Sequence, residues 1–283
     1  MKADPRFVGQ PKEFWAHIRT ISQEVGYTDR STKAIRIPTL AEIREEFLRL
    51  GLSTFHIAND ADLLTDFGHK IFDYFSFRAE FLNQTVQGQL MDKSAAKEEF
   101  ERLKAKLNPT CPLPMNKQKG DKRNYAFLTG MVNMIVEANI GDAPCNYDPR
   151  SLTTITHNAM PLRTLARRVD GAFPSVVNPV GIWEIKENYY TTTFGSRVAD
   201  GVYETLLDGM ELEELEASMG RKVFHLLILD DYFTWWKCGR SYLCRMIDIL
   251  HMGFVDEVIF GREVLTRLPE IALDWKSQYD KML

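Results

Sequence analysis

The sequence predicts an α/β protein with a mixed central sheet flanked by helices and a mostly helical N-terminal region. The first hundred or so residues repeat apolar positions at helical spacing and contain few strand-like runs. Strand-like and helical segments alternate later in the chain. Residues 223–229 form a continuous apolar run, which is typical of a central strand covered on both faces. We therefore divide the chain into a helical region, residues 1–110, and an α/β core, residues 111–283.

The N-terminal region should contain amphipathic helices that bury one face each. Their expected ranges are 11–27, 39–51, 60–91 (as one helix or a broken pair) and 94–107. Thr39 and Glu42 have capping-box spacing at the start of the second range, and Gly51 marks its end. Leu48 and Leu63 are among the residues that we expect to face the core.

Short helices joined at a glycine also suggest a helix-turn-helix motif, in which the segment after Gly51 would enter the major groove of DNA. Residues 52–57 are largely apolar, whereas a recognition helix displays polar and basic side chains. This composition favours a helical cap on the core or a dimerisation surface. Either role would make this region the place where specificity or partner choice is decided.

The core should follow the order β, β, α, β, α, β, α after a leading helix over residues 125–139. A strand over residues 165–169 should end at Asp170, and Pro174 and Pro179 should form the turn to a second strand. That second strand should carry Glu184, Ile185 and Lys186, and the later elements are expected at residues 193–216, 223–229, 241–252 and 255–260, followed by a closing helix.

The most informative residues of this core are Asp170, Glu184 and Lys186. Alternate side chains of a strand share a face, so Glu184 and Lys186 should project together while Ile185 points the other way. The hairpin should bring Asp170 beside Glu184. Two carboxylates supply hard oxygen ligands for Mg²⁺, which polarises a phosphoryl oxygen and lowers the pKa of a bound water. Lys186 would then position that water or stabilise the charge that develops on the phosphate.

These three residues resemble the signature of the PD-(D/E)xK nuclease superfamily, which includes many restriction endonucleases. The resemblance covers roughly residues 125–262. Val169 stands where the motif name has proline, and members often vary there. The Gln-x-x-x-Tyr helix of some branches is missing, because Ala199 lies four residues before Tyr203, which indicates a different branch.

The resemblance implies a restriction-endonuclease-like fold and a Mg²⁺-dependent endonuclease, with Mn²⁺ as a substitute, that cleaves double-stranded DNA. It suggests a restriction or anti-phage setting, with a partner subunit in such a system, and palindromic cutting would imply a homodimer. It also implies two further metal ligands, Glu137 on the leading helix and the backbone carbonyl of Ile185. Glu137 could equally be a solvated helix residue.

Basic residues close to the proposed site are candidates for phosphate contacts. The residues expected to contact DNA are Lys117, Lys119, Lys122, Arg123, Arg167, Arg168 and Arg197. Arg163 belongs to the same cluster as Arg167, whereas the acidic residues 208–216 should face solvent elsewhere. Tyr203 and Glu204 are second-tier candidates for reaching the phosphate. A plain solvated surface remains an alternative for residues 117–123.

Other interpretations stay open. Glu184 and Lys186 could form an ordinary ion pair on a strand face. The fold could be catalytically silent and act as a binding subunit for nucleic acid or protein in a defence complex, or the substrate could be structured or single-stranded nucleic acid. In residues 230–237, Trp235 and Trp236 could stack on bases or simply pack in the core.

Composition excludes several classes of protein. The 283 residues carry a formal net charge of −4, so any DNA binding must rely on local clusters of Lys and Arg. The four cysteines form no Cys-x-x-Cys pair and the histidines show no metal-binding spacing, which argues against a zinc enzyme. No phosphate-binding loop of the Gly-x-x-x-x-Gly-Lys type occurs. Because no signal segment or long apolar run is present, we expect a cytoplasmic protein with no membrane contact.

Overall fold

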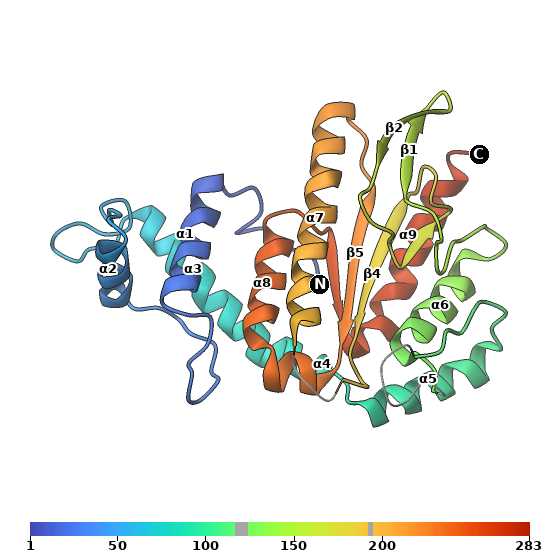
Figure 1. Ribbon diagram of the computed structural model, residues 1–283, viewed down its shortest axis with the longest axis horizontal. Helices are drawn as coiled ribbons and strands as arrows, with labels where there is room; N and C mark the ends of the chain where they lie inside the picture. The colour runs from blue at the N-terminus through green and yellow to red at the C-terminus, as the bar shows by residue number, and fades with distance from the viewer. Residues whose placement is uncertain (117–123, 192–194) are drawn as a thin grey trace.

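A four-stranded mixed sheet forms the centre of the computed structural model, which describes residues 1–116, 124–191 and 195–283 (Figure 1). Its strands are β3 (Gly171–Phe173), β4 (Gly181–Glu187), β5 (Phe224–Asp230) and β6 (Glu257–Phe260), in that spatial order. β3 and β4 are antiparallel, whereas β4, β5 and β6 are parallel. The predicted mixed α/β architecture is therefore confirmed.

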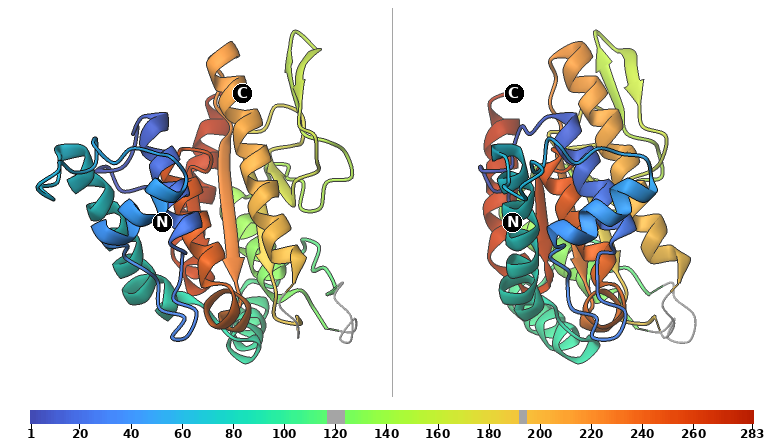
Figure 2. Two further views of the ribbon diagram at one scale, coloured as in Figure 1. Left: turned by 60° about the vertical axis from the view of Figure 1, so that its left-hand side comes forward. Right: turned by 90° about the vertical axis from the view of Figure 1, so that its left-hand side faces the viewer.

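Helices cover both faces of this sheet (Figure 2). α7 (Ser196–Met219) connects β4 to β5, α8 (Arg240–His251) connects β5 to β6, and both cover one face. The other face carries α6 (Phe127–Ile140), α9 (Arg267–Asp280) and, outside α6, α5 (Lys93–Leu107). On that side Trp183 stacks on Trp275, with ring centroids 5.6 Å apart. Burial of both faces explains the uninterrupted apolar sequence of β5.

Two details of the strand prediction are wrong. Residues 165–169 form an irregular connection, and β3 begins only after Asp170. A separate hairpin, β1 (Thr154–His157) and β2 (Met160–Thr164), was not predicted. Its strands lie largely at the surface, so they lack the apolar alternation that reveals a strand.

The N-terminal helices are α1 (Lys12–Glu24), α2 (Leu40–Arg49) and α3 (Asp66–Phe81), and a short π-helix (Leu82–Val86) and α4 (Gln87–Gln89) extend α3. The predicted capping box is present, because Thr39 accepts a hydrogen bond from the Glu42 N–H and Glu42 accepts one from the Thr39 N–H. The helix-turn-helix prediction is wrong, since no helix lies between α2 and α3. Leu48 and Leu63 are exposed rather than buried.

A buried ion pair joins this N-terminal region to the core. Arg78 on α3 donates two hydrogen bonds to Asp248 on α8, at 2.9 and 3.0 Å, and Tyr74 donates a third at 2.7 Å. Both ionic side chains are almost inaccessible to solvent. The chain's N-terminal ammonium also donates a hydrogen bond to the Val258 carbonyl of β6. Among the described residues, no helix has the length and apolarity needed to cross a membrane.

Candidate functional site

Strand β4 directs Glu184 and Lys186 to the face covered by α7, as the strand alternation predicts. Trp183 and Ile185 point to the opposite face, where they pack in the core beside α6 and α9. Glu184 is completely buried, and Lys186 Nζ lies 3.2 Å from Glu184 Oε2. The Glu-x-Lys pair is thus a fixed acid and base on one side of the strand.

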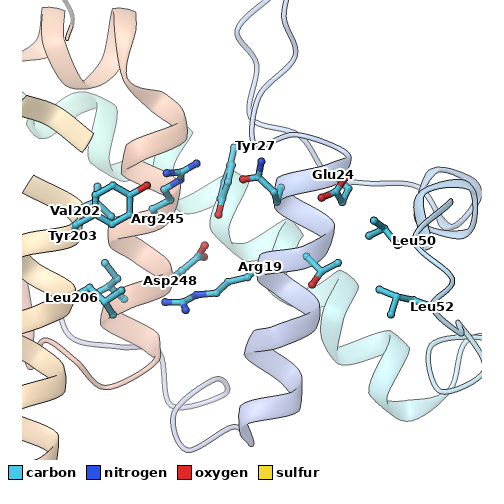
Figure 3. A pocket seen from close by; sticks show the side chains of 13 residues that line it. Arg19, Glu24, Tyr27, Leu50, Leu52, Val202, Tyr203, Leu206, Arg245 and Asp248 are labelled. Carbon is cyan, nitrogen blue, oxygen red and sulfur yellow. The ribbon is translucent and has the colours of Figure 1, made fainter. Parts of the chain in front are cut away.

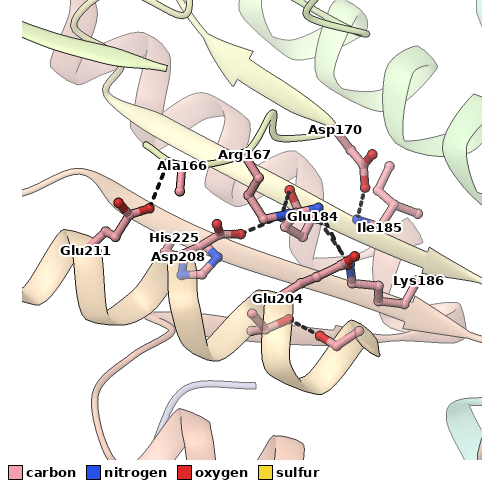
Figure 4. Close-up of polar contacts among 12 residues, drawn as sticks. Ala166, Arg167, Asp170, Glu184, Ile185, Lys186, Glu204, Asp208, Glu211 and His225 are labelled. Atoms are coloured by element: carbon pink, nitrogen blue, oxygen red, sulfur yellow. Dashed lines mark hydrogen bonds and ion pairs between the residues drawn. The ribbon is translucent and has the colours of Figure 1, made fainter. Parts of the chain in front are cut away.

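Asp170 lies beside β4, at the residue directly before the start of β3 (Figure 4). Its Oδ2 accepts a hydrogen bond of 2.7 Å from the N–H of Ile185, and its own N–H donates to the Trp183 carbonyl at 3.1 Å. The hairpin therefore brings Asp170 to the strand that carries Glu184. Gly171 makes this approach possible, because a Cβ there would lie 1.9 Å from the Trp183 ring.

Helix α7 adds two carboxylates that face β4. Glu204 accepts a hydrogen bond from Lys186 Nζ at 2.6 Å. Asp208, one turn later, is completely buried and accepts one from Arg167 at 2.6 Å. Arg167 also lies 3.0 Å from Glu184 Oε1 and 3.5 Å from Glu204 Oε2.

We name this group the acid–base cluster. It consists of Arg167, Asp170, Glu184, Lys186, Glu204 and Asp208.

The cluster contains four carboxyl groups and two cations, so full ionisation would leave an excess of negative charge. Burial and the nearby charge of Glu184 raise the pKa of Asp208 to about 7. The same two causes raise the pKa of Asp170 to about 6, because protein atoms enclose its carboxyl although the residue reaches the surface. Burial opposes the charge on Lys186, but Glu184 and Glu204 outweigh it and raise the pKa of Lys186. Lys186 is therefore a cation at neutral pH.

These groups have the right chemistry for a divalent cation, because carboxylates are hard oxygen ligands and the negative excess needs a counter-charge. Glu184 currently faces Arg167 and Lys186. No group of three or more His, Cys, Asp or Glu side chains is arranged to hold a metal ion within the described ranges. Metal binding by Asp170 and Glu184 would thus require Arg167 to move from Glu184 toward its other partners, Asp208 and Glu204.

A cavity of about 270 Å³ opens beside Asp170. Asp148, Thr129 and Glu187 line it together with Asp170. Glu187 points away from α7, as predicted, and accepts hydrogen bonds of 3.0 Å from the N–H and hydroxyl of Thr129 in the first turn of α6. Burial raises the pKa of Glu187 to about 7 despite these bonds. Asp170 therefore stands between the buried cluster and an open cavity.

The other predicted site residues lie apart from the cluster or make different contacts. Glu137 is on α6, as predicted, but accepts hydrogen bonds from the N–H and hydroxyl of Thr110. Ile185 lies in β4, with its N–H bound to Asp170 and its position opposite Ile228 of β5. Neither observation adds a third metal ligand.

The predicted phosphate contacts have different outcomes. Arg167 pairs with the carboxylates of the cluster, and Arg168 is exposed. Arg197 lies in the first turn of α7, but its side chain is outside the described part of the structure. The remaining candidates, Lys117, Lys119, Lys122 and Arg123, also lie outside the described residues.

Sequence reasoning missed Asp208, which we expected to face solvent with the rest of residues 208–216. The signal for its burial is its helical spacing: Asp208 lies on the same face of α7 as the buried residues Gly201 and Thr205. The base-stacking interpretation is wrong for Trp235 and Trp236, because both are buried. The apolar spacing within residues 193–216 predicts that Leu207 faces the core, but this side chain is exposed.

Comparison with known proteins places the chain in a family. The family model described as "Domain of unknown function (DUF7690)" matches residues 1–85, and "Domain of unknown function (DUF7687)" matches residues 91–275. No curated protein and no solved structure gives a significant match. The junction of the two matches falls where α3 and its extension lead into α5. Since the second match covers more than half of the sequence and contains the whole acid–base cluster, the chain belongs to the DUF7687 family.

Proposed function

We propose that this protein is a Mg²⁺-dependent endonuclease that hydrolyses phosphodiester bonds in double-stranded DNA, with Mn²⁺ as a substitute. The observation that carries the proposal is the placement of Asp170 against the strand segment Glu184–Lys186 by the β3–β4 hairpin. The parallel crossover from β4 through α7 to β5 supports the finer proposal of a restriction-endonuclease-like PD-(D/E)xK core. A restriction or anti-phage role in the cytoplasm is part of this proposal.

Asp170 and Glu184 would hold the Mg²⁺ ion, with the Ile185 carbonyl as a further ligand. When bound, Mg²⁺ supplies charge neutralisation at the phosphate and acidifies a water molecule. Lys186 carries a proton at neutral pH, so its role is to orient the nucleophile or to stabilise negative charge on the phosphate, not to remove a proton. Glu204 holds Lys186 in place through the bond of 2.6 Å.

Arg167 acts as a positioning residue in this proposal. It links Glu184 on β4 to Asp208 on α7, at 3.0 and 2.6 Å. This link belongs to the metal-free protein, and with a metal ion on Glu184 the contact of Arg167 with Asp208 would remain to position α7. Arg168, which is exposed and lies two residues before Asp170, is our candidate among the described residues for contact with a DNA phosphate.

A second candidate is a catalytically silent nuclease-like subunit that binds nucleic acid or protein. The specific observation in its favour is the contact between Arg167 and Glu184, because a guanidinium neutralises the carboxylate that a metal would need. In that case the acid–base cluster would be a buried structural network.

The test is cleavage of supercoiled plasmid DNA by the purified protein with Mg²⁺ or Mn²⁺, and with EDTA as the metal-free control. We expect metal-dependent cutting that falls at least about a hundredfold in Glu184→Gln and in Lys186→Met. Lys222→Met is the matched control, since Lys222 is exposed and pairs only with Asp256 within the described structure. Thermal unfolding shows whether each variant is folded.

The outcomes separate the candidates. Cutting lost in both cluster variants but retained in Lys222→Met supports the nuclease. Full activity in folded Glu184→Gln would refute the site. Absence of cutting by the folded wild-type protein on double-stranded DNA, single-stranded DNA and RNA with either metal would favour the silent subunit.

A further inference from the structure

A cavity whose lining contains none of the acid–base cluster residues lies between the N-terminal helices and the core (Figure 3). Its volume is about 680 Å³, within the range of small-molecule sites. One wall comes from α1 and from the chain after α1 and α2, and the other comes from α7 and α8. We call it the junction cavity.

Among the described residues, two arginines of the junction cavity have no carboxylate partner. Arg19, Glu24, Arg245 and Asp248 are its charged residues among those described. Both acids are already paired with arginines from outside the lining: Glu24 with Arg49, and Asp248 with Arg78 at 2.9 Å. Within the described ranges, neither Arg19 nor Arg245 lies within 4.0 Å of a carboxylate oxygen in an ion pair. Counted together with Arg49 and Arg78, the charged groups around the cavity comprise four guanidinium groups and two carboxylates.

Arg245 contributes a buried hydrogen-bond donor to the lining of the cavity. Its Nε is buried and has no hydrogen-bond partner in the described structure. The guanidinium lies 5.0 Å from the centroid of the Tyr27 ring and 5.2 Å from that of Tyr242, so aromatic rings hold it in place. Figure 3 shows Arg19 reaching from α1 toward α8, and Arg245 lying on α8 across the gap. A bound anion would supply hydrogen-bond acceptors to both.

The remaining lining is aromatic and apolar. Tyr203 is 59 % exposed at the α7 wall, and Tyr27 lies on the opposite side. Leu206 and Ile249 line the core side of the cavity. Planar aromatic rings bind well to tyrosine faces, whereas inorganic phosphate alone would leave this surface in water.

We propose that the junction cavity binds a nucleotide, with Arg19 and Arg245 on its phosphate and Tyr203 against its base. The guanidinium fork matches the geometry of phosphate oxygens. A cavity of this size holds one small ligand, which favours a mononucleotide over a nucleic-acid strand. This site is independent of the proposed nuclease activity, although α7 carries Glu204 and Asp208 of the acid–base cluster as well as Tyr203.

The experiment is isothermal titration calorimetry of the full chain in EDTA, with ATP and the four nucleoside monophosphates. Adenosine, inorganic phosphate and a ten-residue oligothymidylate are the comparison ligands. We expect at least one nucleotide to bind. Adenosine and inorganic phosphate should each bind at least about tenfold more weakly than the nucleotide that binds most tightly. Arg19→Gln and Arg245→Gln should each weaken nucleotide binding by about tenfold or more.

Arg30→Gln is the matched control, because Arg30 is exposed in the same N-terminal region and is not part of the cavity. Tyr203→Ala should weaken nucleotide binding but leave phosphate binding unchanged. Arg19 is exposed, so Arg19→Gln keeps the test valid if Arg245→Gln fails to fold.

Three results would overturn the proposal. The first is no detectable binding of any nucleotide at millimolar concentration by the folded wild-type protein. The second is nucleotide binding that Arg19→Gln and Arg245→Gln leave unchanged. The third is tight binding of the oligothymidylate without binding of any nucleotide, which would identify a nucleic-acid track instead. None of these results depends on cleavage activity.

Discussion

Replacement of Arg167 by methionine tests the electrostatics of the acid–base cluster. Arg167 contacts Glu184 and Asp208, whose side chains are 1 % and 0 % exposed. Removal of one partner from a buried ion pair costs about 3–5 kcal/mol, because the remaining charge stays buried without compensation. Lys186 still lies 3.2 Å from Glu184, so we expect the lower end, about 3 kcal/mol of unfolding free energy at pH 8.

The loss should depend on pH. The folded-state pKa of Asp208 is raised above its ordinary value even with Arg167 present, to about 7. Without the guanidinium of Arg167, protonation of Asp208 in the folded protein becomes still more favourable. A raised carboxyl pKa favours folding at low pH and this contribution is lost as the pH rises through the folded-state value, so the cost of Arg167→Met should shrink between pH 8 and pH 5.

The assay is denaturant unfolding of both proteins at pH 8 and pH 5 in EDTA, repeated at pH 8 with Mn²⁺. Arg163→Met is the control, since Arg163 pairs with Glu211 and with the exposed Glu214. That change should cost at most about 1 kcal/mol. If Asp170 and Glu184 bind metal, Mn²⁺ should stabilise Arg167→Met more than the wild-type protein, because the competing cation is gone.

The reasoning would be refuted by a loss below about 1 kcal/mol at pH 8, which is the range of exposed pairs. An equal loss at pH 5 and pH 8 would contradict the assignment of buried carboxylates as its cause. If Mn²⁺ stabilised both proteins equally, that result would contradict the proposed metal site but not the explanation of the stability loss.

Two further predictions concern regions outside the cluster. Arg78→Met should lower the unfolding free energy by about 3–5 kcal/mol, because it leaves the charge of Asp248 buried without a partner cation. The control Arg102→Met removes an exposed ion pair and should cost at most about 1 kcal/mol. Equal losses of the two variants in denaturant titrations would contradict this prediction. The pKa of Glu187 is raised to about 7, so its contribution to stability is present below pH 4.5 and lost as the pH rises toward 7. Glu187→Gln should therefore lose less stability than the wild-type protein between pH 5 and pH 8 in thermal unfolding, and parallel curves would sink the idea.

Local patterns in the sequence were sufficient for most elements. The capping box at Thr39 and the glycine at position 51 define both ends of α2, because these signals act within one helical turn. The apolar run of β5 is visible because both faces of that strand are covered. The strand alternation also predicted correctly that Glu184 and Lys186 share a face and that Glu187 does not.

Tertiary contacts decided what these patterns could not. The short β1–β2 hairpin lies largely at the surface and has no apolar periodicity. Leu48 has the residue type of a core position but is 80 % exposed, because helix packing and not hydrophobicity alone selects the buried face. Asp208 shows the reverse: its acidic neighbours in the sequence predict exposure to solvent, but the side chain is buried and pairs with Arg167.

The sequence by itself determined the α/β class, the strand that carries Glu184 and Lys186, and the return of the chain that brings Asp170 to that strand. Apolar periodicity and turn residues are local properties, so they can be recognised from neighbouring positions in the sequence. Only the tertiary structure decided that Arg167 and Asp208 join these residues and that Arg19 and Arg245 line the same junction cavity. These groups come from separate segments, and their mutual distances depend on how whole helices pack against the sheet.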